Sequence, residues 1–232
     1  MSAFPDLAPV GALLGEPTRA AILTELFNGR ALTAGELASR AGVSASTASA
    51  HLSRLVEGRL LSVVSQGRYR YYKLAGPHVA AALEALASLA PAPVAHDAFE
   101  GEVLTGLRFA RTCYGHLAGR LGVAVRDRLL EAEFVCEDGL EHRVTPTGAR
   151  WFGEFGLDLE AVRRARRSYA RACLDWSERR PHLAGALGDA LLQSMFDRGW
   201  LRRQCGERAV ELTRAGYRGL EASLGLALGR AS

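Results

Sequence analysis

The segment from Leu32 to Leu74 constrains the fold of this 232-residue chain more than any other. Thr33 precedes a short amphipathic run and has Glu36 three residues on, which is the pattern of a capping box at a helix start. Ser44 can cap a second amphipathic run of about three turns. Alternating β-favouring residues follow, with a tight turn at Gln66-Gly67. Helix, turn, helix and hairpin in this order predict a winged helix-turn-helix domain.

The second helix and the hairpin carry the features of a DNA-binding surface. Ala48, Leu52 and Leu55 recur at helical spacing, which leaves short polar side chains on the opposite side. Such a side can enter the major groove closely. Arg68 and Arg70 project from the hairpin and can clamp phosphates, so binding should weaken steeply with salt. The alternative is that these arginines are only solvated, but their position after a helix-turn-helix favours a double-stranded DNA operator as the partner.

Residues 1–90 resemble the ArsR/SmtB family of bacterial repressors. The resemblance rests on the segments EPTRAAILTEL, LTAGELASRAGVSASTASAHLSRLVEGRLL and QGRYRYYKL. It implies a homodimer that binds an inverted-repeat operator and releases it when an inducer, often a metal ion, binds. It also implies DNA contacts from the second helix and the wing, at Ser44, Ser46, Thr47, Ser49, His51, Arg54, Arg68 and Arg70. We include Gln66 of the wing turn among the candidates. Ala45 departs from the family, where Gln is common, which removes one base contact.

The family's usual inducer sites are missing from this chain. The first helix of the motif, from Ala34 to Ala41, contains no cysteine pair. The last helix of the domain, expected from Pro77 to Leu89, offers only His78, and a stable metal site needs three or four donors. An effector must therefore act elsewhere. We expect the helices around Leu7 to Leu14 and Pro77 to Leu89 to form the dimer, because two half-sites require a fixed spacing of recognition helices.

Composition limits the remaining function classes. The chain has 48% hydrophobic and 23% charged residues and a net charge of +4, which suits an anionic partner without identifying one. No run reaches the roughly 18 apolar residues of a membrane helix, and no secretion signal is present, so we expect a cytoplasmic protein with no membrane partner. The sequence lacks a G-x-S-x-G elbow, a P-loop and an H-E-x-x-H motif, which argues against an enzyme.

The rest of the chain contains an internal repeat. A proline-containing linker is expected at 91–96, between a domain at 1–90 and a second one at 97–232. RTCYGHLAGRLG returns as RACLDWSERRPHLAGALG, and the copies cover about 111–155 and 171–222. Each copy predicts a helix, a hairpin and a T-x-x-G motif in which Thr145 or Thr213 caps a further helix. The predicted fold is mainly α with small hairpin wings, and its second domain consists of two degenerate winged-helix-like repeats.

Equivalent cysteines and histidines in the two copies suggest a metal site. A pseudo-twofold packing of the copies brings Cys113, His116, Cys173 and His182 together as the Cys2His2 set that zinc or another thiophilic metal accepts. The spacing places Cys113 and His116 one helical turn apart on one helix face. Cys173 and His182 are nine residues apart, which requires the insert between them to fold back. The alternatives are that the cysteines sense redox state or that the repeated residues only pack.

Two further features of the second domain have competing interpretations. The segment 159–172 has the periodicity of a helix rich in arginine, which would either contact DNA or pair with nearby acids. Trp151, Tyr169, Trp176 and Trp200 could line a pocket for a small organic effector between the repeats, or they could form the core of the domain.

Together these patterns predict a dimeric, operator-binding repressor that needs no cofactor to bind DNA. Its effector, a metal or a small molecule, acts on the second domain. The alternatives are a metal- or thiol-sensing regulator that uses the repeated cysteines and histidines, and a regulator whose second half binds another protein.

Overall fold

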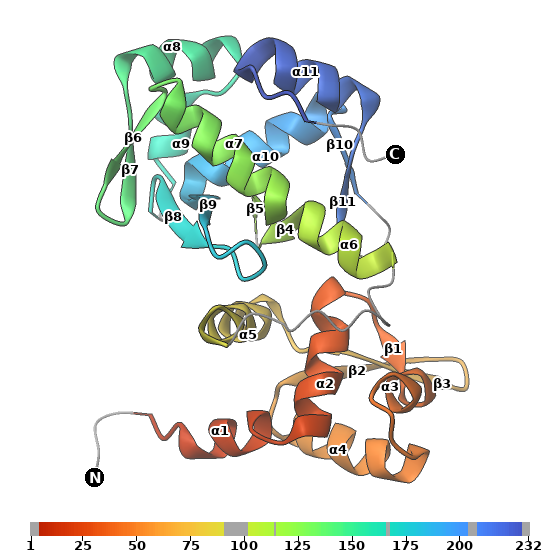
Figure 1. The fold of residues 1–232 in the computed structure, drawn as a ribbon. Helices are drawn as coiled ribbons and strands as arrows, with labels where there is room; N and C mark the ends of the chain where they lie inside the picture. The colour runs from red at the N-terminus through yellow and green to blue at the C-terminus, as the bar shows by residue number, and fades with distance from the viewer. Residues whose placement is uncertain (1–4, 91–101, 114, 166–167, 204–207, 229–232) are drawn as a thin grey trace. The chain divides into compact units, whose positions relative to one another are not determined.

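A computed structural model describes residues 5–90, 102–113, 115–165, 168–203 and 208–228 (Figure 1). The chain divides into two compact units, Met1–Leu83 and Glu84–Ser232. The boundary falls within the helix predicted at Pro77–Leu89, rather than after it. The predicted linker at 91–96 lies outside the described residues. Among the described helices, none is long and apolar enough to cross a membrane.

The first unit is a winged helix-turn-helix. Its elements are α1 (Ala8–Leu14), α2 (Pro17–Glu25), the 3-10 helix η1 (Leu26–Asn28), β1 (Leu32–Thr33), α3 (Ala34–Arg40), α4 (Ala45–Glu57), β2 (Leu61–Gln66), β3 (Tyr69–Leu74) and the start of α5 (Pro77–Leu89). The three strands form an antiparallel sheet in the order β1-β3-β2. Ile22, Leu26, Leu37, Leu52 and Leu55 are fully buried and join α2, η1, α3 and α4 in one core.

The local signals of the first unit are confirmed. Thr33 and Glu36 form a reciprocal capping box at the start of α3, and the Ser44 hydroxyl accepts a hydrogen bond from the Thr47 amide at the start of α4. The hairpin pairs Gln66 with Tyr69. Gly67 lies in its turn at a φ of 57°, a left-handed conformation that glycine adopts without strain.

The second unit contains two segments with the same order of elements. The first runs through β4 (Arg111–Cys113), β5 (His116–Ala118), α7 (Gly119–Glu131), β6 (Val135–Asp138), β7 (Glu141–Val144) and α8 (Pro146–Glu154). The second runs through β8 (Arg171–Leu174), β9 (Pro181–Ala184), α10 (Gly185–Asp197), β10 (Leu201–Arg203), β11 (Val210–Leu212) and α11 (Arg214–Leu224). Helices α6 (Glu102–Phe109) and α9 (Leu159–Arg163) precede β4 and β8. The mainly helical fold class with small antiparallel sheets is confirmed; the winged-helix-like interpretation of each copy stays a prediction.

The helices and hairpins of the two copies interlock. Strand β5 packs on α10, β9 packs on α7, and β5 and β9 lie next to each other. Figure 1 shows α7 and α10 between these hairpins and the pair α8 and α11. A Cβ at Gly122 of α7 would lie 3.5 Å from that of His182, and one at Gly188 of α10 would lie 3.2 Å from that of His116. The repeated glycines therefore permit each copy's histidine strand to approach the other copy's helix.

The T-x-x-G motif has the same physical role in both copies. The hydroxyls of Thr145 and Thr213 accept hydrogen bonds from the amides of Gly148 and Gly216, so each threonine caps its helix. A Cβ at Gly148 would lie 1.8 Å from the Phe134 carbonyl oxygen, so this position accepts only glycine.

Two predicted helices of the second unit are wrong. Residues 111–118 form a hairpin in which Cys113 pairs with His116, not a helix face. Gly119, at a φ of 79°, turns the chain from this hairpin into α7. The arginine-rich segment 159–172 is not one helix, because α9 ends at Arg163 and β8 begins at Arg171. In both places the spacing of residues fits a helix and a strand, and the pairing of β4 with β5 and of β8 with β9 decides the outcome.

Candidate functional site

The predicted DNA-binding side of α4 and the wing is open to solvent. The side chains of Ser46, Thr47, Ser49 and Arg54 are exposed, as are those of Gln66, Arg68 and Arg70 in the wing. The Ser44 hydroxyl caps α4 and also lies 2.9 Å from the Ser46 hydroxyl. The guanidinium groups of Arg68 and Arg70 lie over the rings of Tyr69 and Tyr72, which supports the extended side chains on the hairpin surface.

His51 differs from the other eight candidates. Its Nδ1 lies 3.2 Å from Glu16 Oε2 and 3.4 Å from an Arg19 guanidinium nitrogen. Glu16 caps α2, so the His51 side chain contacts the start of α2. Its position on α4 matches the family pattern, but its side chain connects two helices within the unit.

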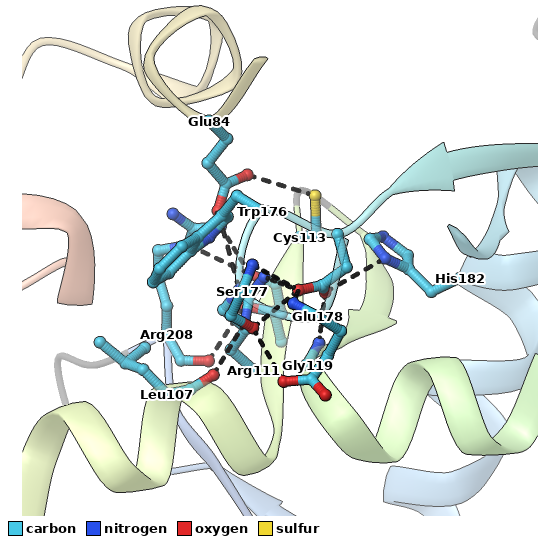
Figure 2. Close-up of polar contacts among 12 residues, drawn as sticks. Glu84, Leu107, Arg111, Cys113, Gly119, Trp176, Ser177, Glu178, His182 and Arg208 are labelled. Carbon is cyan, nitrogen blue, oxygen red and sulfur yellow. Dashed lines mark hydrogen bonds and ion pairs between the residues drawn. The ribbon is translucent and has the colours of Figure 1, made fainter. Parts of the chain in front are cut away.

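The four predicted metal ligands come together in the second unit. Cys113 and His116 are cross-strand partners in β4 and β5, and Cys173 and His182 are partners in β8 and β9. One ligand atom from each of the four residues lies within 4.8 Å of every other. The rings of His116 and His182 meet edge to face, with centroids 4.9 Å apart. We call this set the Cys2His2 cluster; Figure 2 shows Cys113 and His182 with their surroundings.

Each histidine of the cluster has a neighbour at Nδ1. His116 Nδ1 lies 2.5 Å from the Cys113 carbonyl oxygen, and His182 Nδ1 lies 3.3 Å from Asp175 Oδ2. An acceptor at Nδ1 selects the tautomer whose Nε2 carries a lone pair. His182 is 1% exposed, and within the described residues neither Nδ1 nor Nε2 has a hydrogen-bond partner of suitable geometry, so the contact of Asp175 with Nδ1 is electrostatic. The arrangement thus presents Nε2 lone pairs as candidate ligands.

The pKa values of the two thiols are shifted in opposite directions. The neighbouring Cys113 thiol and His182 lower the pKa of Cys173 to about 5, against the opposing effect of burial. The neighbouring Cys173, burial and the negative charge of Glu84 raise the pKa of Cys113. Burial disfavours the charged form of His182, but its contacts with Asp175 and Cys173 outweigh burial and raise its pKa. These shifts favour the thiolate form of Cys173 and the thiol form of Cys113.

Buried charges surround the Cys2His2 cluster. Asp175 is fully buried and accepts a 2.8 Å hydrogen bond from Arg111, which is 1% exposed. The Arg111 guanidinium also lies 4.6 Å from the centre of the Trp176 ring. Burial would raise the pKa of Asp175, but contacts with His182, Arg111 and the Gly119 amide hold it well below its usual range. Glu84, the first residue of the second unit, accepts hydrogen bonds from Cys113 and Trp176.

Sequence reasoning missed the roles of Arg111, Asp175 and Glu84. A signal was present for Glu84, because it is the one acidic residue in the apolar segment Pro77–Leu89. Charged residues in such segments are buried only with partners. Another was the position of Asp175, two residues after a repeated cysteine, although only the fold shows what it contacts.

The four aromatic residues predicted to line a pocket have different neighbours among the described residues. Trp151 stacks between Phe134 and Phe155, and Trp200 meets Phe155 edge to face. Trp176 lies under Arg111 instead, and Tyr169 lies against Arg163. A cavity of about 450 Å³ in this unit is lined by other residues, among them Asp189, Gln193 and Arg203. The aromatic side chains mostly extend the hydrophobic core.

Comparison with known proteins decides the family. A model described as a helix-turn-helix domain matches residues 14–64. The HTH-type transcriptional regulator YdfF of Bacillus subtilis is 43% identical over 212 residues, which cover 91% of this chain and 94% of YdfF. The chain belongs to the HTH-type transcriptional regulators. The expected DNA-binding winged helix-turn-helix and the expected role in transcription regulation are thereby confirmed.

Other similar proteins match shorter stretches of the chain. The HTH-type transcriptional regulator CmtR of Mycobacterium bovis is 40% identical over 77 residues, or 33% of this chain and 64% of CmtR. Among solved structures, reduced HlyU from Vibrio cholerae is 30% identical, covers 35% of this chain and 84% of its own, and has a TM-score of 0.32. The cadmium sensor CmtR from Mycobacterium tuberculosis is 35% identical, covers 41% and 99%, and has a TM-score of 0.33.

Proposed function

We propose that this regulator is a dimeric, non-enzymatic repressor that a thiophilic metal releases from an inverted-repeat operator. The exposed polar side of α4 and the basic wing would bind the operator. The Cys2His2 cluster would bind the inducing metal. The observation that carries the proposal is the meeting of two thiols and two imidazoles, from two segments about 60 residues apart, at ligand distances below 4.8 Å.

The donor set fits zinc or a metal of similar softness. A tetrahedral zinc site with two sulfur and two nitrogen ligands has ligand–ligand distances of about 3.3–3.8 Å. The cluster therefore needs a contraction of at most about 1.5 Å between ligand atoms to close around the ion. The orphaned Nε2 of His182 supports the same conclusion, because metal binding would satisfy this buried atom. A bound ion would supply a fixed charge and a covalent link between the two hairpins.

Apolar side chains at the predicted dimer helices support the dimer. Leu7 and Val10 at α1 are 74% and 40% exposed, and Leu86 and Leu89 on α5 are 47% and 80% exposed. Large apolar side chains in such positions are typical of surfaces that a partner covers. A second copy of the chain is the partner that the two-fold symmetry of an inverted repeat requires.

The test uses full-length protein purified without chelator. Elemental analysis and thiol titration should find about one metal per chain, with Cys113 and Cys173 protected. Metal loading should lower affinity for a DNA site selected in vitro about 100-fold, equivalent to about 2.7 kcal/mol of coupling. The double variant Cys113→Ser with Cys173→Ser should keep DNA binding and lose this response.

The matched control for this test is Cys136→Ser, which removes a thiol outside the cluster. It should behave as the unchanged protein. Absence of metal together with freely titrating thiols in the unchanged protein would refute the metal proposal.

Thiol sensing is the second candidate, and the lowered pKa of Cys173 favours it. A thiolate beside a thiol can be oxidised by a peroxide to a disulfide, with loss of both metal-binding sulfurs. Mass spectrometry of peroxide-treated, metal-free protein would find a Cys113–Cys173 cross-link if this candidate holds.

A further inference from the structure

We propose that two buried carboxylates, Asp175 and Glu84, set the metal affinity of the Cys2His2 cluster in opposite directions. Asp175 would increase the affinity because it fixes His182 as a ligand. Glu84 would decrease it because its carboxylate oxygen lies 3.3 Å from Cys113 Sγ and would repel the metal-bound sulfur. This inference rests on the proposed function, since it concerns the metal that the cluster binds.

Asp175 is held rigidly and can transmit that rigidity to His182. Its Oδ1 accepts hydrogen bonds from Arg111 at 2.8 Å and from the Ser177 amide and hydroxyl at 2.9 and 2.7 Å. Its Oδ2 accepts from the Gly119 amide at 2.6 Å and lies 3.3 Å from His182 Nδ1. A carboxylate on the far nitrogen of a metal-binding histidine fixes the ring's orientation and raises its basicity as a ligand. The position of Asp175 thus favours binding at His182 Nε2.

Glu84 makes a contact that metal binding would have to break. Its Oε2 lies 3.3 Å from Cys113 Sγ, and the thiol donates to the carboxylate (Figure 2). Its Oε1 accepts from Trp176 Nε1 at 3.2 Å and from Arg208 Nη2 at 2.6 Å, so the carboxylate is anchored on its other side. A cysteine binds a metal as the thiolate, which has no proton to donate. The bound state would therefore place a negative sulfur against an anchored carboxylate oxygen.

The two carboxylates predict variants with effects of opposite sign. Asp175→Asn removes the negative charge behind His182 and should weaken zinc binding by about 10–100-fold. Glu84→Gln removes the charge beside Cys113, and its amide can donate a hydrogen bond to the thiolate. This variant should strengthen zinc binding by on the order of 10-fold. A variant that merely damaged the fold would not strengthen binding.

The experiment measures zinc affinity of full-length protein by competition with a chromophoric chelator, at one pH, for the unchanged chain and both variants. Cobalt(II) absorption would show whether the tetrahedral sulfur and nitrogen ligand set is retained. The exposed Glu154→Gln is the matched control for charge removal and should leave the affinity unchanged. If Asp175→Asn does not fold, Ser177→Ala removes one hydrogen bond to Asp175 and should weaken binding by about threefold.

The outcomes separate this inference from the proposed function. If the unchanged chain binds neither zinc nor cobalt, the proposed function fails. If the unchanged chain binds zinc, two results would show that the assignment of the carboxylates is wrong while the metal site stands. One is that Glu84→Gln does not strengthen zinc binding. The other is that neither Asp175→Asn nor Ser177→Ala weakens zinc binding. Stronger binding in Glu84→Gln with weaker binding in either Asp175→Asn or Ser177→Ala supports it.

Discussion

The DNA-binding side of the first unit and the Cys2His2 cluster of the second unit are built in opposite ways. The first displays polar side chains on a single helix and hairpin, and these side chains are exposed, while the core lies on the other side. The second collects four side chains from four strands in two separate segments, and three of the four are buried. An exposed surface can be altered without loss of core packing, whereas a buried cluster is part of the packing itself. Substitutions on the exposed surface of the first unit and in the buried cluster of the second unit should therefore have separable effects.

The largest expected effect concerns the reactivity of the buried cluster. Because the pKa of Cys173 is lowered to about 5, its thiolate exists above that pH, and alkylation of metal-free protein by iodoacetamide should have a midpoint near pH 5. An ordinary cysteine has a midpoint near 8.5, so the thiolate fraction at pH 6 differs by on the order of 100-fold. Labelling followed by peptide mass spectrometry measures the midpoint. Cys113→Ala should raise it because the thiol next to Cys173 is lost, and a midpoint above pH 8 in the unchanged chain would contradict the lowered pKa of Cys173.

The next effect concerns the exposed surface. Arg54→Ala and Arg68→Ala should each weaken operator binding by about 1–3 kcal/mol, or roughly 5- to 150-fold, through loss of base or phosphate contacts. Arg68→Ala should also reduce the dependence of affinity on salt by about one phosphate contact. Fluorescence anisotropy over a range of salt concentrations measures both quantities. Arg218→Ala removes an exposed arginine from α11 and serves as the control. Normal operator affinity in both wing and helix variants would overturn the assignment of the DNA-binding surface.

The smallest effect tests whether the two units are stabilised separately. Thr33→Ala and Thr213→Ala each remove an N-cap hydroxyl, so each should lower the free energy of unfolding of its own unit by about 1 kcal/mol. All three tryptophans lie in the second unit. Urea unfolding followed by tryptophan fluorescence should therefore respond to Thr213→Ala and not to Thr33→Ala, while circular dichroism responds to both. Equal responses of the fluorescence transition would show that the units unfold as one.

The Cys2His2 cluster shows how far sequence reasoning can go. The repeat correctly indicated which four residues meet, but it placed Cys113 and His116 on a helix. A spacing of three residues fits both one helical turn and a pair across a two-residue hairpin turn. The spacing of nine residues between Cys173 and His182 fits only a hairpin. Because the two copies are equivalent, a hairpin could also have been predicted for Cys113 and His116.

The sequence by itself determined the first unit, because caps, helical periodicity and a turn glycine act over a few residues and agree with one another. It also determined the pairing of cysteines with histidines, through the repeat. Only the tertiary structure decided that these pairs lie on strands, that Trp151 and Trp200 belong to the core, and that Asp175 and Glu84 flank the cluster. The positions of Asp175 and Glu84 depend on contacts between residues 29 to 124 positions apart, and no local pattern encodes the energy of such contacts.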